Sequence, residues 1–334
     1  MQQRQLGPFQ VSAIGLGCMN LSHAYGAPPS PEQGTKVLHA ALDAGVTLFD
    51  TAALYGFGAN ETLVGKVLKG ERQRFKLASK CGMQGVDVAG DGKLVRVIDG
   101  RPETLRATCE AALRRLQTDV IDLYYLHRWD KKVPIEESVG GLSDLVRAGK
   151  IQSIGLSEVS ATTLRKAHAV HPIAAVQTEY SLWTRNPEIA VLQACSELGI
   201  AFVAFSPVAR GFFCDTDLDP AQFSANDIRR SMPRFAPENF AANLRLLAAF
   251  RQMAREQGCT AAQLALAWLL HKAPHVIPIP GTASVEHLQD DMRAASVVLS
   301  PQVVVELDDL INQKTVAGNR YGAQASSEVD TEVF

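Results

Sequence analysis

The sequence predicts an α/β fold built as a parallel (β/α)8 barrel. Along the 334 residues, about eight short apolar runs alternate with longer amphipathic segments, which is typical of repeated strand–helix units. The apolar runs carry almost no charge, as strands covered on both faces of a sheet require. Eight such units within about 250 residues match the usual size of this barrel.

The elements follow one another in a regular order. A small β-hairpin over residues 6–11 is expected before the first core strand. The expected strands are 13–17, 46–49, 75–80, 119–126, 151–156, 174–178, 200–205 and 275–279. The expected helices are 31–43, 60–68, 102–116, 135–148, 160–170, 187–198, 239–257, 260–271 and one from Ser284. The helix over 31–43 shows the usual start and stop signals, since Pro31 opens its first turn and Gly45 follows its end.

A doubly wound open sheet is the alternative fold. It would usually carry G-x-G-x-x-G in its first strand–helix turn, but the turn over residues 15–20 reads GLGCMN and lacks the third glycine. We therefore favour the barrel and expect residues 1–334 to form one domain. The connection over 206–238, after strand seven, is unusually long, and such loops tend to be functional. The polar tail from about 315 to 334 is expected to be mobile unless it folds over the barrel mouth.

Composition excludes several classes of function. A hydrophobic content of 46% and a charged content of 20% are typical of a soluble globular protein. A formal net charge of -2 gives no electrostatic attraction for nucleic acid or anionic membrane. No CxxC pair occurs and no apolar run approaches the ~18 residues of a membrane span. We expect a cytoplasmic protein with reduced cysteines, no metal site, and a monomeric or homo-oligomeric state.

Four residue types that can move protons follow successive predicted strands. Asp50 and Tyr55 come after strand two, Lys80 ends strand three, and His127 follows strand four. In a (β/α)8 barrel the active site lies at the carboxyl ends of the strands, so these side chains should lie together. An ammonium such as Lys80 should lower the pKa of a phenol from its free value of ~10. This set suits protonation of an alkoxide formed from a carbonyl, with hydride supplied by a cofactor.

Other interpretations of these residues remain open. Asp50 and Lys80 could form only a structural ion pair, and His127 could belong to a solvated rim. A Schiff-base aldolase could use Lys80 as its nucleophile. A nucleotide-binding sensor or accessory subunit could keep the pocket without turnover. Turnover of a broad aldehyde separates the enzyme from the sensor.

The motifs resemble those of the aldo-keto reductase superfamily, in particular its bacterial and plant branch. The resemblance covers nearly the whole chain, from GLGCM at residue 15 to NRYG at residue 319, and D-T-A-x-x-Y-G is matched from Asp50 to Gly56. It implies a barrel that reduces aldehydes and ketones with NADPH, generally without metal. It also implies Tyr55 as general acid, Lys80 and Asp50 as its tuning pair, and His127 as the residue that orients the substrate.

The same resemblance implies a cofactor site. The positions that bond the nicotinamide carboxamide are matched by Ser157, Glu158 and Gln177. Phe205 stands at the position of an aromatic ring that stacks on the nicotinamide ring. The pyrophosphate loop would comprise Ser206, Pro207, Val208, Arg210, Gly211 and Phe212. The remaining cofactor positions are Gly17, Cys18, Met19, Asp50, Ile279, Pro280, Gly281, Thr282, Ser284, His287, Asp290 and Asp291. The resemblance favours NADP(H) as the cofactor. NAD(H) is possible, because Ala283 and Ser284 supply no positive charge for the 2′-phosphate of NADP(H).

Substrate specificity is expected to come from side chains around the barrel mouth. Besides Tyr55 and His127, the candidates are Met19, Asn20, Tyr25, Phe57, Trp129, Trp183 and Phe213. Because most of them are aromatic or apolar, a hydrophobic or ring-bearing carbonyl compound is the expected substrate.

Overall fold

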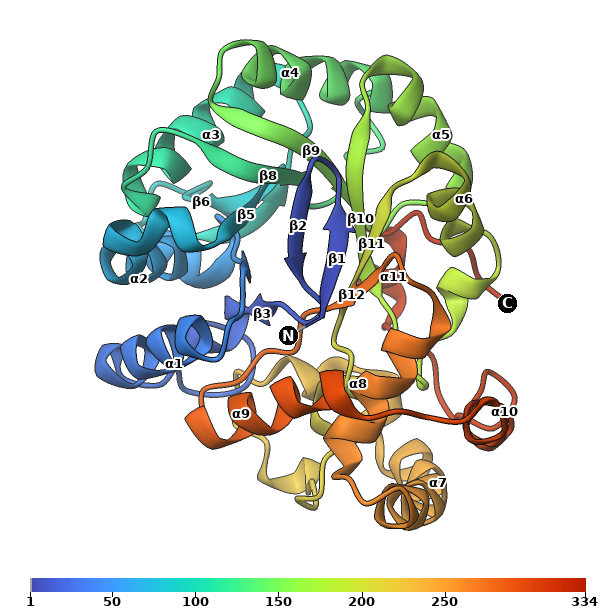
Figure 1. Ribbon diagram of the computed structural model, residues 1–334. Helices are drawn as coiled ribbons and strands as arrows, with labels where there is room; N and C mark the ends of the chain where they lie inside the picture. Colours follow the sequence, from blue (N-terminus) through green and yellow to red (C-terminus); the bar gives the residue numbers. More distant parts are fainter. Residues whose placement is uncertain (1) are drawn as a thin grey trace.

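The computed structural model describes residues 2–334 and confirms the barrel (Figure 1). Its eight parallel strands are hydrogen-bonded in the order β12-β11-β10-β9-β8-β5-β4-β3. The backbone N–H groups of Gly15 and Gly17 donate to the carbonyls of Pro278 and Pro280 at 3.0 and 2.9 Å. These two bonds join the first strand segment to the last and close the barrel.

The barrel strands lie close to the predicted positions. Their bounds are β3 (Leu16–Gly17), β4 (Leu48–Asp50), β5 (Lys76–Cys81), β8 (Ile121–Leu126), β9 (Ile151–Ser157), β10 (Ile173–Glu179), β11 (Ala201–Phe205) and β12 (Val276–Pro278). The first strand is shorter than predicted because only Leu16 and Gly17 pair with β4. Glycine is required at the closing seam, since a Cβ on Gly17 would lie 2.8 Å from the carbonyl oxygen of Ile279.

Helices cover the outside of the barrel. Their bounds are α1 (Pro31–Asp43), α2 (Ala59–Leu68), α3 (Pro102–Leu116), α4 (Ile135–Arg147), α5 (Ala161–Val170), α6 (Val191–Leu198), α7 (Pro237–Glu256), α8 (Ala261–Lys272), α9 (Val285–Arg293), α10 (Pro301–Leu310) and α11 (Ala323–Ser327). The predicted ranges of α1 and α3 are confirmed to the residue. The prediction for α6 was too long, because Ala190 has a non-helical φ of -153° that separates the helix from a 3-10 turn over Asn186–Glu188.

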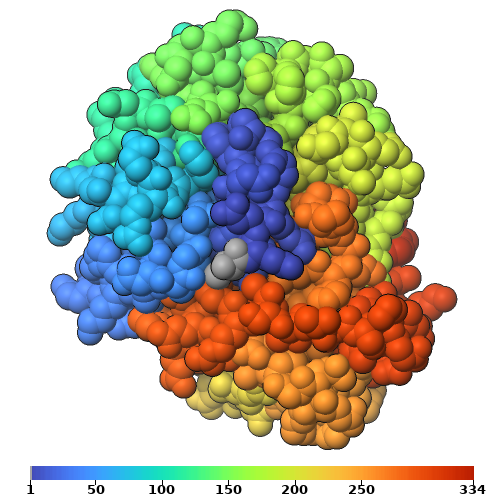
Figure 2. Space-filling view, viewed as in Figure 1, coloured from blue at the N-terminus to red at the C-terminus, as the bar shows by residue number. Residues whose placement is uncertain are grey.

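The N-terminal hairpin closes one end of the barrel. It consists of β1 (Gln3–Leu6) and β2 (Phe9–Ser12), paired antiparallel. Leu6, Phe9 and Val11 pack against strand residues of the barrel interior such as Leu123 and Ala175. In Figure 2 the hairpin fills the centre of this face, and Figure 1 views the barrel from the same side. Access to the interior is therefore left to the opposite end, where the strands terminate.

Two segments shape that opposite end. The long connection after β11 runs to Pro237 at the start of α7, with 3-10 turns over Ala209–Gly211, Pro220–Gln222, Ile228–Ser231 and Pro233–Phe235. A second hairpin, β6 (Met83–Val86) with β7 (Val95–Ile98), follows β5 and was not predicted. Its strands are short and its second strand is partly exposed, so they lack the buried apolar run that marks the barrel strands.

The C-terminal segment lies across the same end. Arg320 forms an ion pair with Glu158, which follows β9, and Glu328 lies 2.6 Å from Arg96 on β7. Lys131 donates to the carbonyl of Val329 at 2.8 Å. These contacts bind the polar tail to loops that follow three different barrel strands. Among residues 2–334, no helix has both the length and the apolar character that crossing a bilayer requires.

Candidate active site

A cavity of about 1200 Å³ opens at the carboxyl ends of the barrel strands. Its wall includes residues at or just after seven of the eight strands: Gly17, Asp50, His127, Ser157, Gln177, Phe205 and Ile279. Single small-molecule pockets usually measure about 300–1,000 Å³. The cavity is therefore large enough for a dinucleotide together with a small substrate.

The four predicted catalytic side chains lie together at this end. The Lys80 ammonium is 3.2 Å from the Tyr55 hydroxyl, forms an ion pair with Asp50, and donates to the carbonyl of Thr51 at 2.8 Å. The ring centroids of Tyr55 and His127 are 5.9 Å apart, in an edge-to-face arrangement. Tyr55, Asp50 and His127 line the cavity, whereas Lys80 is 0% exposed and lies behind them.

The pKa of Tyr55 differs in direction from the prediction. Burial raises the pKa of this phenol above its ordinary value, and the neighbouring Lys80 ammonium opposes the rise without cancelling it. The predicted effect of Lys80 is thus present, but desolvation outweighs it. The phenol is therefore protonated at neutral pH, which suits a proton donor.

Lys80 and Asp50 form a buried, hydrogen-bonded pair. Burial acts to lower the pKa of Lys80, but Asp50 and then Tyr55 raise it above the ordinary value. Burial raises the pKa of Asp50, against the opposing effects of Lys80 and Gln177. The other Asp50 oxygen accepts a 2.7 Å bond from the Gln177 side chain. The lysine is therefore held as a cation by three acceptors and has no free lone pair for nucleophilic attack.

His127 is a neutral imidazole. Burial first, and then the nearby cations Arg128 and Lys80, lower its pKa well below the ordinary value. Its Nδ1 is buried and has no hydrogen-bond partner within residues 2–334. A neutral imidazole on the cavity wall can donate one hydrogen bond to an oxygen without adding charge.

Most of the predicted cofactor positions lie on the cavity wall. They are Gly17, Met19, Asp50, Ser157, Gln177, Phe205, Ser206, Pro207, Val208, Arg210, Gly211, Ile279, Gly281, Thr282, Ser284, His287, Asp290 and Asp291. Four predicted positions do not lie there: Cys18, Glu158, Phe212 and Pro280. Cys18 is fully buried in the core, Phe212 stacks on Trp183 with centroids 4.2 Å apart, and the Pro280 carbonyl closes the barrel.

Glu158 requires a specific correction. We expected its carboxylate to accept from a carboxamide in the cavity. Instead, one oxygen accepts the backbone N–H of Glu179 at 3.0 Å, and the other forms an ion pair with Arg320 of the C-terminal tail. Both oxygens are thus engaged within the protein. The sequence could not show this, because Arg320 lies more than 150 residues away.

The loop after β11 has an unusual backbone. Ser206, Ala209, Arg210 and Gly211 all have positive φ, between 50° and 89°. Successive residues of this kind direct backbone N–H groups into a concavity that attracts anions, and such strain clusters at ligand sites. The Arg210 guanidinium beside this loop forms a buried ion pair with Glu179. The loop geometry therefore fits a phosphate group, while Arg210 is already neutralised.

At the end of the cavity beside α9, none of the residues 2–334 that line the wall is an arginine or a lysine. Thr282, Ala283, Ser284, His287, Asp290 and Asp291 lie there. Ser284 caps α9 by accepting the N–H of His287 at 3.3 Å. Burial, and then repulsion from Asp290, raise the pKa of Asp291 to about 7. This end therefore offers hydrogen bonds and a helix N-terminus, but no permanent positive side chain.

The predicted substrate residues divide into two groups. Met19, Asn20 and Tyr25 line the cavity beside Tyr55 and His127. Four others lie elsewhere: Phe57, Trp129, Trp183 and Phe213. Phe57 borders a separate small hollow, and the Trp129 indole donates to the Val133 carbonyl at 2.8 Å. Trp183 and Phe213 are buried in an aromatic cluster behind the wall. The wall is thus less aromatic than expected.

Several cavity residues were missed by the sequence analysis. They include His23, Leu54, Met83, Arg96, Arg128, Tyr321, Gln324 and Glu328. Arg128 could have been found, since it follows His127 directly. Leu54 could likewise have been found, since it precedes Tyr55 directly. The remaining residues come from the second hairpin, the C-terminal tail and the loop before α1, whose positions no local pattern indicates.

Comparison with known proteins agrees with this geometry. The sequence profile of the Aldo/keto reductase family matches residues 13–312. A Probable aldo-keto reductase 1 from Glycine max is 43% identical over 329 residues, covering 96% of this chain and 93% of the relative. The structure of a glycerol dehydrogenase from Gluconobacter oxydans superposes with a TM-score of 0.84 at 28% identity, over 92% of this chain and 94% of that chain. An aldo/keto reductase from Klebsiella pneumoniae, in complex with NADP and acetate, gives a TM-score of 0.71 at 29% identity, over 96% and 99%.

Proposed function

This chain belongs to the aldo/keto reductase family, and we propose that it reduces an aldehyde or ketone to an alcohol with NADP(H), or catalyses the reverse oxidation. The observation that carries the proposal is the buried phenol of Tyr55, which is 3.2 Å from Lys80 and borders a cavity large enough for cofactor and substrate. A small-molecule carbonyl compound is the substrate that the family implies.

In this proposal each side chain has one task. The Tyr55 hydroxyl donates its proton to the substrate oxygen as negative charge develops there. Lys80, held by Asp50, stabilises the phenolate that is left behind. The neutral His127 donates a hydrogen bond to the same oxygen and so orients the carbonyl. When bound, the nicotinamide cofactor supplies the hydride.

The cavity wall provides a match for each part of a nicotinamide dinucleotide. The Phe205 ring offers a stacking face, and Ser157 with Gln177 offers polar groups beside it. The positive-φ loop over 206–211 suits the pyrophosphate, and the N-terminus of α9 would face the adenosine. NADP(H) is favoured because the Klebsiella pneumoniae relative is described with NADP. NAD(H) remains the alternative because no lysine or arginine lines the adenosine end within the described residues.

A Schiff-base mechanism has little support from the geometry. Lys80 is 0% exposed, carries a raised pKa and bonds to three oxygens. A nucleophilic lysine needs a neutral amine and contact with the substrate carbon. Neither condition is met by Lys80.

The proposal is tested by cofactor oxidation. Purified protein is mixed with NADPH or NADH and a broad aldehyde such as 4-nitrobenzaldehyde, and the absorbance of the reduced cofactor is followed. We expect turnover with the aldehyde and none without it. In parallel, quenching of tryptophan fluorescence gives the affinity for each cofactor. Cofactor binding without turnover of any aldehyde or ketone would support a sensor and overturn the proposed activity.

A further inference from the structure

Four arginines line the cavity, and three of them are neutralised. The four are Arg96, Arg128, Arg210 and Arg229. Arg96 is 2.6 Å from Glu328, Arg229 is 2.7 Å from Asp227, and Arg210 is paired with Glu179. Arg128 forms no ion pair with any carboxylate in the part of the chain that the structure describes. It therefore differs from the other arginines of the same wall.

Arg128 is directed to the reacting groups by its place in the chain. It follows His127 at the end of β8, and its Nη1 donates to the His127 carbonyl at 2.7 Å and to the Ser157 hydroxyl at 3.2 Å. Burial and then Arg128 lower the pKa of His127, and Arg128 also opposes the burial-driven rise in the pKa of Tyr55. The guanidinium therefore borders the same cavity as Tyr55 and His127, the two side chains that would contact the carbonyl oxygen.

Among the described residues that line the cavity around Tyr55 and His127, Arg128 carries a positive charge that no carboxylate balances. Lys80 balances Asp50, Arg96 balances Glu328, and His127 is neutral. The Nε and Nη2 groups of Arg128 donate to no acceptor among residues 2–334, although the side chain is half-buried. A guanidinium that is partly removed from water costs free energy unless an anion pairs with it. The free edge formed by Nε and Nη2 matches the two oxygens of a carboxylate.

We propose that the substrate is a carbonyl compound that carries a carboxylate, which Arg128 binds while the carbonyl oxygen faces Tyr55 and His127. This proposal rests on the proposed reductase function and names its class of substrate. A single unbalanced charge fits a carboxylate monoanion better than a phosphate dianion, because Arg96, another arginine of the cavity wall, is already paired with Glu328. Arg128 acts here as a specificity residue.

The test compares two aldehydes of the same shape that differ in charge. The substrates are 4-carboxybenzaldehyde and its neutral analogue 4-formylbenzamide, each measured with saturating NADPH and the full chain. We expect wild-type protein to have the higher kcat/KM for the carboxylate, although the carboxylate activates the aldehyde less than the amide does. Arg128→Gln should lower the ratio of the two kcat/KM values on the order of 10- to 100-fold, chiefly through KM. Arg128→Lys should retain part of the preference.

A matched control removes an arginine elsewhere. Arg106 is exposed on α3 and lies 3.9 Å from Asp144, outside the cavity. Arg106→Gln causes the same change in net charge, and we expect it to leave the ratio unchanged. Tryptophan quenching by NADPH reports whether each variant keeps its folded cofactor site.

Each other outcome has a definite meaning. If wild-type protein reduces 4-formylbenzamide at least as efficiently as the carboxylate, the inference fails while the proposed function stands. If Arg128→Gln slows both aldehydes equally and weakens NADPH binding, Arg128 serves the cofactor and the inference also fails. If wild-type protein oxidises NADPH with neither aldehyde nor any other carbonyl compound, the proposed function itself fails.

Discussion

Two buried tyrosines in this barrel each contact a charged side chain, but their surroundings differ. Tyr180, just after β10, donates to the Glu188 carboxylate at 2.6 Å. Tyr55 lies 3.2 Å from the Lys80 ammonium. Burial raises the pKa of both phenols above the ordinary value. The pKa alone therefore does not distinguish a structural tyrosine from a candidate catalytic one.

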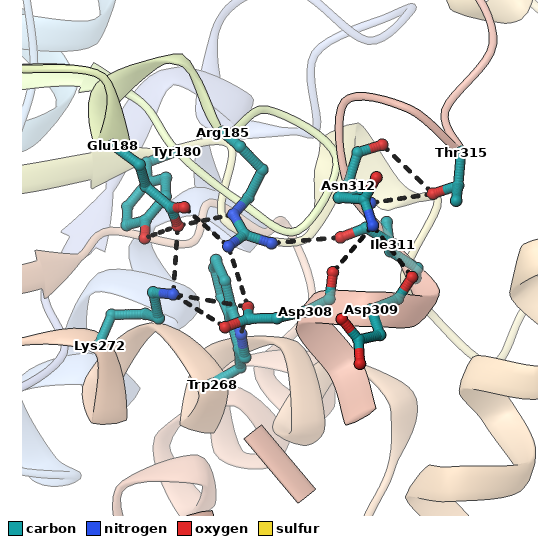
Figure 3. Close-up of polar contacts among 10 residues, drawn as sticks. All are labelled: Tyr180, Arg185, Glu188, Trp268, Lys272, Asp308, Asp309, Ile311, Asn312 and Thr315. Carbon is teal, nitrogen blue, oxygen red and sulfur yellow. Dashed lines mark hydrogen bonds and ion pairs between the residues drawn. The ribbon is translucent and has the colours of Figure 1, made fainter. Parts of the chain in front are cut away.

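The difference lies in how completely each neighbourhood satisfies its polar groups. Figure 3 shows the network around Tyr180, in which Arg185 bonds to Glu188 at 2.7 Å and lies 3.0 Å from Asp308. Lys272 bridges the same two carboxylates at 3.3 and 3.1 Å. Arg185, Lys272, Glu188 and Asp308 each have a partner of opposite charge, and together they fasten α10 to α8 and to the turn after β10. A closed network of this kind stabilises the fold and leaves no group for a ligand.

The neighbourhood of Tyr55 is open by contrast. His127 Nδ1 has no partner within the described residues, Arg128 has no carboxylate, and both side chains border the cavity. Buried polar groups are normally satisfied in folded proteins. Buried hydrogen bonds and ion pairs therefore indicate a structural role where every polar group has a partner. They indicate a binding site where some polar groups beside a cavity have none.

The largest expected effects come from removing the hydroxyl of each tyrosine in turn, which tests whether Tyr55 and Tyr180 have different roles. Tyr55→Phe should lower kcat by about 10²–10⁴-fold, because a positioned general acid contributes that much. Its thermal stability and NADPH affinity should stay close to those of wild type. Tyr180→Phe should do the reverse, lowering the free energy of unfolding by about 1.5–3 kcal/mol with kcat unchanged. Wild-type turnover in Tyr55→Phe would remove the phenol from the mechanism.

The closed network can be tested through its central arginine. Arg185→Ala removes one of the two cations that pair with Glu188 and Asp308, whose side chains are 26% and 27% exposed. Because the lost hydrogen bonds join charged groups, the free energy of unfolding should fall by about 1.5–3 kcal/mol. The exposed pair Arg147–Asp144 on α4 supplies the control, since the Arg147 side chain is 71% exposed and that of Arg185 only 7%. Arg147→Ala should change the stability by less than about 1 kcal/mol. Urea unfolding measures both, and equal losses would contradict the distinction.

A third prediction concerns the open end at α9. Ser284→Lys would place an ammonium at the end of the cavity that we propose for the adenosine, where the described residues supply no lysine or arginine. We expect the ratio of NADPH to NADH affinity to rise on the order of tenfold, because a charge-assisted bond to the 2′-phosphate is gained. Ser284→Gln has a long side chain without charge and should leave the ratio near its wild-type value. A similar rise in both variants would show that size, and not charge, is responsible.

The smallest expected effect is a pH dependence of cofactor binding. Because the pKa of Asp291 is raised to about 7, its carboxyl is neutral below that pH and negative above it. We expect NADPH affinity to fall relative to NADH affinity between about pH 6 and pH 8, as the new charge repels the 2′-phosphate. Asp291→Asn should flatten this dependence. Parallel slopes in the wild type and the variant would exclude Asp291 as the cause.

A large part of the fold could be predicted from local sequence patterns. Helices α1 and α3 could be predicted to the residue because Pro31 and Pro102 mark their starts. The barrel strands could be predicted because strands covered on both faces are continuous apolar runs. The β6–β7 hairpin could not be predicted, because β7 is exposed or half-buried and so lacks a continuous apolar run. One of its contacts is the ion pair of Arg96 with Glu328 of the tail.

The candidate site shows the same division. Asp50, Tyr55, Lys80 and His127 could be placed together in advance, because parallel strands bring their carboxyl ends to one edge and these residues follow adjacent strands. The outer wall could not be predicted. Glu158 forms an ion pair with Arg320 instead of lining the cavity, and Trp183 and Phe213 are buried in the core.

Sequence by itself therefore determined the barrel and the inner ring of polar side chains, because both depend on periodicity and on local position along each strand. Which charges are neutralised depends on the tertiary structure. In the folded chain, Glu158 pairs with Arg320 and Arg96 pairs with Glu328. Arg128 has no carboxylate partner among residues 2–334. The physical reason is that an ion pair needs two side chains within a few ångströms. In this protein, Arg320 and Glu328 of the tail lie more than 150 positions away in the chain from their partners Glu158 and Arg96.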